Sequence, residues 1–143
     1  MTGTELLAVN GVTKAYPGVV ANSDVSFSIA EGEVHALLGE NGAGKSTTLN
    51  ALMGILPSRG RVVFDGQDLA DATLEDRVMM GLALVPEKRE LFSTMPVEDN
   101  LILGGWRAMK QRVPNWQREI ERVYGLFPRL KERRTQLAGT LSG

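Results

Sequence analysis

The sequence contains no cysteine and has almost no net charge. Without a thiol the chain can form neither a disulfide nor a thiolate metal site, which agrees with a reducing compartment. Its 16 Lys and Arg residues nearly balance its 17 Asp and Glu residues, giving a net charge of −1. The chain therefore lacks the broad basic field that nucleic-acid binding usually needs, and we expect no nucleic-acid partner.

Long apolar runs are missing as well. The longest nearly apolar stretch, 78–85, is too short to cross a bilayer. Residues 1–5 have neither the positive charge nor the apolar segment of a secretory signal. These absences predict a cytoplasmic location, or attachment to a membrane through another protein. The 143 residues suffice for one domain.

The most informative feature is a glycine-rich loop that fits the phosphate-binding pattern G-x-x-x-x-G-K-[ST]. An apolar run, 34–38, precedes the loop and predicts a buried strand. Apolar residues follow it at helical spacing, at Leu49, Leu52, Met53 and Leu56. The pattern predicts a strand, a glycine turn and a helix. The candidate binding residues are Gly39, Glu40, Asn41, Gly42, Ala43, Gly44, Lys45, Ser46 and Thr47.

The residue types of this loop suit a polyphosphate bound together with Mg²⁺. Glycines allow φ > 0, so successive backbone N–H groups can point at one ligand. A helix that begins near Lys45 adds unpaired N–H groups and a partial positive charge, and the ammonium group adds a full charge. We expect the hydroxyl of Ser46 to be a ligand of Mg²⁺, which prefers hard oxygen donors. The alternative is a glycine turn without a ligand.

Turn and periodicity signals divide the rest of the chain into short elements. Strands are expected at 6–12, 25–29, 61–64 and 82–85. Helices are expected at 73–80, 96–104 and 114–127, the first of them opened by a capping box of Thr73 and Asp76.

Other conspicuous residues have ordinary structural explanations. The only histidine, His35, is expected to pack in the core. Asp65 comes before Gly66 after a short strand, which is typical of a hairpin turn and not of a metal ligand.

The last third of the chain has an aromatic stripe and a run of positive charge. The stripe is expected to pack in a core or against a partner, and the charged run to be a solvated face. The stripe consists of Trp116, Ile120, Val123, Tyr124 and Phe127, and the run of Arg129, Lys131, Arg133 and Arg134.

Four stretches together resemble one family: EVHALLGENGAGKSTT, GRVVFDG, ALVPEKRELFSTMPVEDNL and LFPRLKERRTQLAGTLSG. From Leu6 to Gly143 the chain closely resembles the ATP-binding subunit of ABC transporters, and its back half is most similar to the branched-chain amino acid importers. The resemblance implies an α/β fold. It consists of a P-loop NTPase (ABC ATPase) core with a small antiparallel β-subdomain at 1–92, and the start of a helical subdomain at 93–143.

The resemblance also implies roles for residues outside the loop. Tyr16 lies where the family stacks an aromatic ring on adenine, although it could instead only cap the β-subdomain by packing. Glu87 stands where most of the family has a glutamine near Mg²⁺. A carboxylate is still an oxygen ligand, and the alternative is a solvated loop glutamate.

The chain resembles only part of the family's catalytic machinery. Leu141-Ser142-Gly143 matches the opening of the signature LSGG[QE], which caps the ATP of a second subunit in a head-to-tail dimer. The family hydrolyses ATP with an aspartate that ends a long apolar strand, an adjacent glutamate and a downstream histidine, and the chain contains none of them. We therefore expect an N-terminal fragment that binds ATP and Mg²⁺, turns over little, and exposes the edge of its phosphate-loop strand.

Membrane permease subunits are the partners that the resemblance implies, at the inner face of the cell membrane. The solute is open among branched-chain amino acids, sugars, and urea or amides. A GTPase is a poor alternative, because neither D-x-x-G nor N-K-x-D occurs. A second alternative is a non-hydrolysing module that binds a nucleotide or only packs against membrane subunits.

Overall fold

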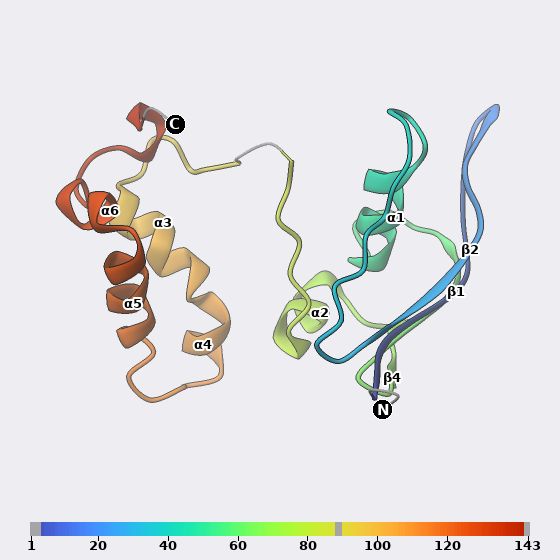
Figure 1. The fold of residues 1–143 in the computed structure, drawn as a ribbon, viewed down its shortest axis with the longest axis horizontal. Coiled ribbons are helices and arrows are strands. Elements are labelled where there is room, and N and C mark those ends of the chain that lie inside the picture. The colour runs from blue at the N-terminus through green and yellow to red at the C-terminus, as the bar shows by residue number, and fades with distance from the viewer. Residues whose placement is uncertain (1–3, 88–89, 142–143) are drawn as a thin grey trace. The chain divides into compact units, whose positions relative to one another are not determined.

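The computed structural model describes residues 4–87 and 90–141. The chain divides into two compact units, Met1–Leu84 and Val85–Gly143, each of which is described by itself (Figure 1). The subdomain division expected at residues 92 and 93 stays a prediction. No helix in the described ranges is both long enough and apolar enough to span a membrane.

The first unit contains a four-stranded antiparallel sheet in the order β2-β1-β3-β4 (Figure 1). Its strands are β1 (Glu5–Tyr16), β2 (Val19–Ala30), β3 (Arg59–Phe64) and β4 (Gln67–Asp68). Leu7 and Val9 alternate onto the buried face, as the period of a strand requires. The register shifts between Val9 and Val12, and this irregularity keeps Val12 on the same buried face. The sheet confirms the small antiparallel β-subdomain.

The turn between β3 and β4 confirms the prediction for Asp65. Asp65 and Gly66 have φ values of 47° and 73°, the left-handed pair that a tight hairpin with right-handed twist needs. The backbone N–H of Asp65 also donates to the carbonyl of Leu6 at 2.8 Å. Asp65 is therefore a turn residue.

Helix α1 (Lys45–Leu52) packs against this sheet and completes its core. Ala51 and Leu52 are buried with Leu7, Val9 and Val12. The apolar spacing predicted a longer helix, as far as Leu56. The helix ends earlier because Gly54, with φ of 73°, donates to the carbonyl of Ala51 and turns the chain away.

Helix α2 (Leu74–Met80) begins with the predicted capping box. The Thr73 hydroxyl accepts from the backbone N–H of Asp76 at 3.1 Å, and the Asp76 carboxylate accepts from the backbone N–H of Thr73 at 2.9 Å. The hydrogen bonds from Thr73 hold the pKa of the Asp76 carboxyl below its usual value.

Arg77 of α2 anchors the end of α1. Its side chain is buried and donates to the carbonyls of Leu52 at 2.6 Å, Leu69 at 2.7 Å and Ala72 at 3.2 Å. Leu52 is the last residue of α1, where a positive charge also interacts favourably with the helix dipole. One guanidinium thus joins α1, the segment after β4, and α2.

Two predicted strands are absent from the structure. Residues 34–38 and 82–85 have no regular secondary structure, and neither segment belongs to the one sheet of the described residues. Val34, Leu38 and Val85 are 96%, 88% and 89% exposed. The prediction was wrong because apolar content alone does not make a strand: its backbone must pair with a neighbour.

The predicted core position of His35 was also wrong. Its segment pairs with no strand of the described residues, so its side chain stays 31% exposed. The imidazole stacks on Phe27 with ring centroids 5.1 Å apart, and its Nδ1 lies 3.5 Å from a carboxylate oxygen of Glu33.

The second unit is helical. Its elements are α3 (Val97–Gly104), α4 (Trp106–Lys110), α5 (Arg118–Leu126), α6 (Pro128–Glu132) and the 3-10 helix η1 (Ala138–Thr140). The predicted helix at 96–104 is present as α3. The one predicted at 114–127 starts only at Arg118, after Asn115 has adopted a left-handed φ of 56°.

The start of α3 is hydrogen-bonded to the segment between α6 and η1. The backbone N–H groups of Val97 and Glu98 donate to the carbonyls of Gln136 and Arg134, each at 2.9 Å. These bonds satisfy donors that a helix leaves unpaired in its first turn.

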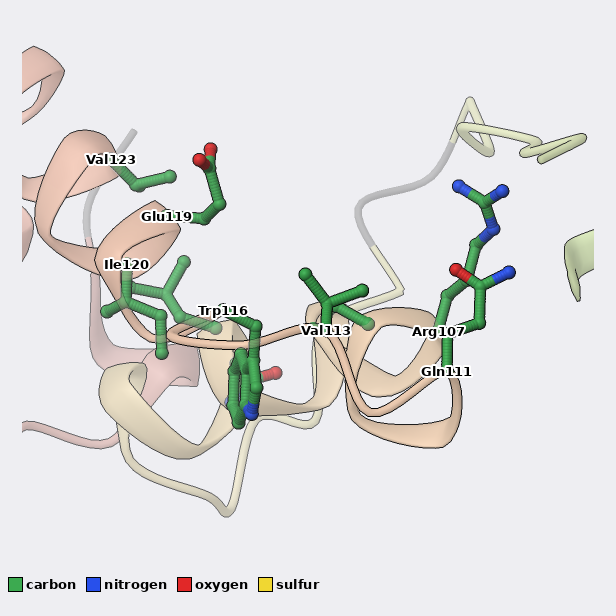
Figure 2. A pocket seen from close by; sticks show the side chains of 12 residues that line it. Arg107, Gln111, Val113, Trp116, Glu119, Ile120 and Val123 are labelled. Carbon is green, nitrogen blue, oxygen red and sulfur yellow. The ribbon is translucent and has the colours of Figure 1, made fainter.

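The aromatic stripe packs only in part. Tyr124 is 3% exposed, whereas Phe127 is 58% exposed. Trp116 borders a cavity of about 530 Å³, together with Ile120 and Val123 (Figure 2). The run of positive charge is mainly on the surface, where Lys131 pairs with Glu121 at 2.8 Å. The expectation of a largely solvated face holds for that run.

Replacement of Arg77 by methionine should destabilise the first unit. Arg77→Met keeps the aliphatic stem but removes the side-chain donor to the carbonyls of Leu52 and Ala72, and one of the two donors to that of Leu69, which still accepts from the N–H of Ala72 at 3.2 Å. A buried unpaired acceptor costs about 1–3 kcal/mol. We expect a loss of about 2–4 kcal/mol in the free energy of unfolding. Hydrogen exchange of the β1 amides measures the stability of this unit alone. Tryptophan fluorescence would report on the second unit instead, because Trp106 and Trp116 both lie there.

Arg61→Met is the matched control for this substitution. Arg61 is exposed and pairs on the surface with Asp68 at 2.6 Å, so its loss should change stability far less. Equal effects of the two substitutions would contradict an anchoring role for Arg77.

Candidate functional site

The glycine-rich loop leads directly into α1. Gly44 caps the helix with φ of 85° and ψ of 7°, and Gly42 has φ of 88°. Both are left-handed conformations that side chains rarely tolerate. The backbone N–H of Ala43 donates to the carbonyl of Glu40 at 3.1 Å, which closes a tight turn. Positive φ is thus found at Gly42 and Gly44, while Gly39 has no such φ value.

The end of α1 that faces this loop suits an anion. No side chain caps it by a hydrogen bond, and the first turn contains no acidic residue. The first N–H groups of a helix have no intrahelical partner, and they carry the positive end of its dipole. The backbone of this loop therefore offers several donors and no competing carboxylate in the helical turn.

The ammonium group of Lys45 lies across the loop. Its Nζ donates to the carbonyl oxygens of Gly39 at 2.6 Å and Glu40 at 2.9 Å. These bonds place the positive charge inside the curve of the loop, between its first residues and the start of α1. A negatively charged ligand in the loop would lie within reach of this charge.

Hydroxyl groups follow the lysine. Ser46 is exposed in the first turn of α1, Thr47 is half-buried and Thr48 is buried. No group of three His, Cys, Asp or Glu side chains in the described residues could hold a metal. The Ser46 hydroxyl, like phosphate oxygens and water, is a hard oxygen donor of the kind that Mg²⁺ prefers.

One residue that holds this loop was not identified from the sequence. Asn22 of β2 is 5% exposed and contacts the start of α1. Its amide fits with the nitrogen toward the carbonyls of Ala21 and Gly44, at 2.7 and 3.2 Å, and with the oxygen toward the hydroxyl of Thr48 at 2.9 Å. The reverse orientation would set the oxygen against two carbonyls. Nothing in the local pattern around Asn22 signals this contact.

Tyr16 lies at the end of β1, beside the turn to β2. Its ring is 42% exposed, and the ammonium group of Lys14 lies 5.0 Å from its centre. In Figure 1 this turn and the loop ahead of α1 lie at the same end of the first unit. The ring is therefore accessible for stacking, and its contact with adenine stays a prediction.

The remaining candidates belong to the second unit. Glu87 is exposed in a bend without regular structure, and its role as a metal ligand stays a prediction. Leu141 follows η1, while Ser142 and Gly143 lie outside the described residues. The structure thus brings the loop residues 39–47 together within the first unit.

Solved structures show which class of protein has this fold. An ATP-binding subunit of an ABC transporter is 29% identical, with a TM-score of 0.75 over 96% of this chain and 56% of that one. A cassette of an ABC transporter in its ADP conformation is 26% identical, with a TM-score of 0.74 over 98% of this chain and 60% of that one. The fold is therefore the α/β P-loop NTPase fold of an ABC ATPase, as expected.

The chain belongs to the ABC transporter family, whose model matches residues 22–143. BraG of Pseudomonas aeruginosa, a high-affinity branched-chain amino acid transport ATP-binding protein, is 39% identical over 96% of this chain and 58% of its own length. The L-arabinose transport ATP-binding protein AraG of Geobacillus stearothermophilus is 35% identical over 95% and 27%. The ribose import ATP-binding protein RbsA 1 of Burkholderia thailandensis is 43% identical over 72% and 21%. The chain thus spans between 21% and 58% of the length of these relatives.

A side chain at Gly44 should disrupt the loop. In Gly44→Ala the new methyl group would collide with the Asn22 amide and lie 2.5 Å from the carbonyl oxygen of Ala21. Backbone strain adds to this collision, because left-handed φ costs roughly 1–2 kcal/mol for a residue with Cβ. We expect a loss of stability well above that strain, measured by urea denaturation with backbone circular dichroism.

Gly18→Ala is the control for strain alone. Gly18 has φ of 80°, but its added Cβ would meet no atom within 4 Å. If Gly44→Ala were no more costly than Gly18→Ala, the close approach of Asn22 and Ala21 to the loop would be refuted.

Proposed function

We propose that this chain binds ATP with Mg²⁺ at residues 39–47, as the nucleotide-binding part of the ATP-binding subunit of an ABC importer. The observation that carries the proposal is the loop itself. Two left-handed glycines turn it into the uncapped N-terminus of α1, with the Lys45 ammonium group within its curve. This arrangement concentrates donors and positive charge where a triphosphate can lie.

The loop and two residues outside it have distinct tasks in this proposal. The backbone N–H groups and the end of α1 bind phosphate oxygens. Lys45 exchanges the carbonyls of Gly39 and Glu40 for phosphate oxygens, which are stronger acceptors because they are charged. The Ser46 hydroxyl and Glu87 would hold Mg²⁺, which when bound neutralises part of the phosphate charge. Tyr16 stacks on the adenine ring.

The proposed partners are membrane permease subunits and a second ATP-binding subunit arranged head to tail, at the inner face of the cell membrane. The support for these partners is family membership and the names of the relatives. Leu141-Ser142-Gly143 would open the signature that caps the nucleotide of the second subunit.

We propose branched-chain amino acids as the solute of the importer. The support is BraG, a branched-chain amino acid transport ATP-binding protein, which among the relatives described above is matched over the largest share of its own length. ATP-binding proteins of arabinose transport and ribose import are 35% and 43% identical, so a sugar is the second candidate. Identification of the permease subunit that binds this chain would decide between an amino acid and a sugar.

Nucleotide binding is separate from hydrolysis in this chain. Phosphoryl transfer requires a group that positions the attacking water, in addition to the phosphate-binding loop. The sequence has no long apolar strand that ends in aspartate followed by glutamate, and its one histidine, His35, stacks on Phe27. We expect the chain alone to bind ATP and to hydrolyse little of it.

Removal of the Lys45 charge should abolish this binding. Calorimetric titration of the wild-type chain with ATP and Mg²⁺ should give a measurable heat of association, and Lys45→Ala should give none, because the charged contact to the phosphates is lost. Lys110→Ala, which removes a charge from the second unit, should bind like the wild type. The proposal fails if the wild type shows no heat. ATP turnover that vanishes in Lys45→Ala would contradict the expected inactivity.

Substitution of Tyr16 should weaken ATP binding without affecting the phosphate contacts. Stacking of a base on an aromatic ring contributes about 1–3 kcal/mol, so Tyr16→Ala should raise the dissociation constant of ATP about 5- to 150-fold. Tyr16→Phe keeps the ring and should bind ATP normally. Inorganic triphosphate has no base, so its affinity should be the same in all three proteins. An unchanged affinity of Tyr16→Ala for ATP would leave Tyr16 only its packing role.

A further inference from the structure

We propose that Asn22 is a positioning residue for the phosphate loop: its buried side-chain amide sets the direction in which the backbone at Gly44 and Lys45 offers its donors. The inference rests on the proposed nucleotide site and adds to it a residue outside the loop motif. Asn22 lies on β2, more than twenty residues before Lys45, and touches no ligand itself in this scheme.

The hydrogen bonds of Asn22 all serve the junction of β2, the loop and α1. Its nitrogen donates to the carbonyls of Ala21 at 2.7 Å and Gly44 at 3.2 Å. Its oxygen accepts from the hydroxyl of Thr48 at 2.9 Å and from the backbone N–H of Thr48 at 3.2 Å. At 5% exposure, Asn22 is shielded from water that could replace these bonds. A buried amide is stable only when paired, so each contact constrains the others.

A β-bulge brings these groups to the loop. In the register of β1 and β2, Lys14 pairs with Asn22 and Ala15 pairs with Val20. Ala21 is therefore an extra residue without a partner on β1. Bulges bend a strand and redirect its groups. Here the bulge coincides with the point where the Ala21 carbonyl and the Asn22 amide meet the loop.

The geometry of the peptide bond connects Asn22 to the candidate ligand site. The carbonyl of Gly44 and the N–H of Lys45 belong to one planar trans peptide, so they point in opposite directions. The Asn22 amide donates to that carbonyl from the side of the sheet, and the backbone N–H of Thr48 donates to it from within α1 at 2.8 Å. The Lys45 N–H is thereby directed away from the sheet and α1. A free donor in that direction is what a bound phosphate requires.

Steric contact fixes the same peptide. The space beside Gly44 is filled by the Asn22 amide and by the carbonyl oxygen of Ala21, so close that a methyl group would not fit. The loop therefore cannot relax toward the sheet. Without the amide, the Gly44 carbonyl would keep the donors of Thr48 in α1, its backbone N–H at 2.8 Å and its hydroxyl at 3.0 Å, but would lose the lateral hydrogen bond from the sheet. The N–H of Lys45 could then turn away from the ligand. Asn22 would then act on affinity through the backbone, in addition to any effect on stability.

Calorimetry with Asn22→Leu tests this inference directly. Leucine has a similar size but neither donates nor accepts, so the dissociation constant of ATP with Mg²⁺ should rise about tenfold or more. Thr48→Val removes the hydroxyl that Asn22 bonds, and should raise it about threefold or more. Ser23→Ala, an exposed neighbour on β2, should bind like the wild type. All titrations are made where thermal unfolding shows each protein to be fully folded.

A second measurement separates positioning from a purely structural role. In the ligand-free protein, the ¹H–¹⁵N signal of the Lys45 amide should shift in Asn22→Leu and Thr48→Val, and stay in place in Ser23→Ala. A purely structural role would lower the melting temperature and leave both this signal and the affinity of the folded protein unchanged. That result would overturn the inference.

The remaining outcomes also decide the question. If the wild type does not bind ATP, the proposed function fails, and the positioning role fails with it. If the wild type binds and Asn22→Leu binds equally well, only the positioning role fails. If Asn22→Leu does not fold, Thr48→Val decides: weaker binding with a shifted Lys45 signal supports the role, and unchanged binding refutes it.

Discussion

The main chain at Gly44 passes from loop to helix in a left-handed conformation, with the Ala21 carbonyl and the Asn22 amide pressed against it. The candidate site depends on this passage. It starts α1 at Lys45, leaves the first N–H groups of the helix without a side-chain cap, and places the ammonium group over the carbonyls at the beginning of the loop. Since α1 also packs its buried side into the core of the sheet, the position of the loop is fixed by the same contacts that stabilise the first unit.

Signals that act between neighbouring residues were read correctly from the sequence. The capping box of Thr73 and Asp76 needs only groups three residues apart, and the turn at Asp65 and Gly66 needs only φ values that these residues tolerate. The loop motif is equally local. Its glycines and its lysine specify a turn and a charge within a few residues, and the structure has both.

Signals that depend on distant partners were read poorly. Residues 34–38 and 82–85 have the apolar composition of buried strands, yet the described residues offer them no neighbour to pair with. His35 was misplaced for the same reason. Asn22 was overlooked because a single asparagine in a strand has no pattern of its own. Its importance emerges only when a bulge in β2 sets it against the start of α1.

In the proposed function, the hydrogen bonds of Lys45 to Gly39 and Glu40 would make phosphate binding an exchange of acceptors. A phosphate would replace two hydrogen bonds from the ammonium group to the protein's own carbonyls, so its affinity would be the difference between two sets of contacts. The two hydrogen bonds also restrain the lysine side chain, so it would lose little further rotamer freedom on binding a phosphate. The loop would thus keep its conformation between binding events. Dissociation of the nucleotide would be assisted, because the carbonyls of Gly39 and Glu40 can accept from the ammonium group again.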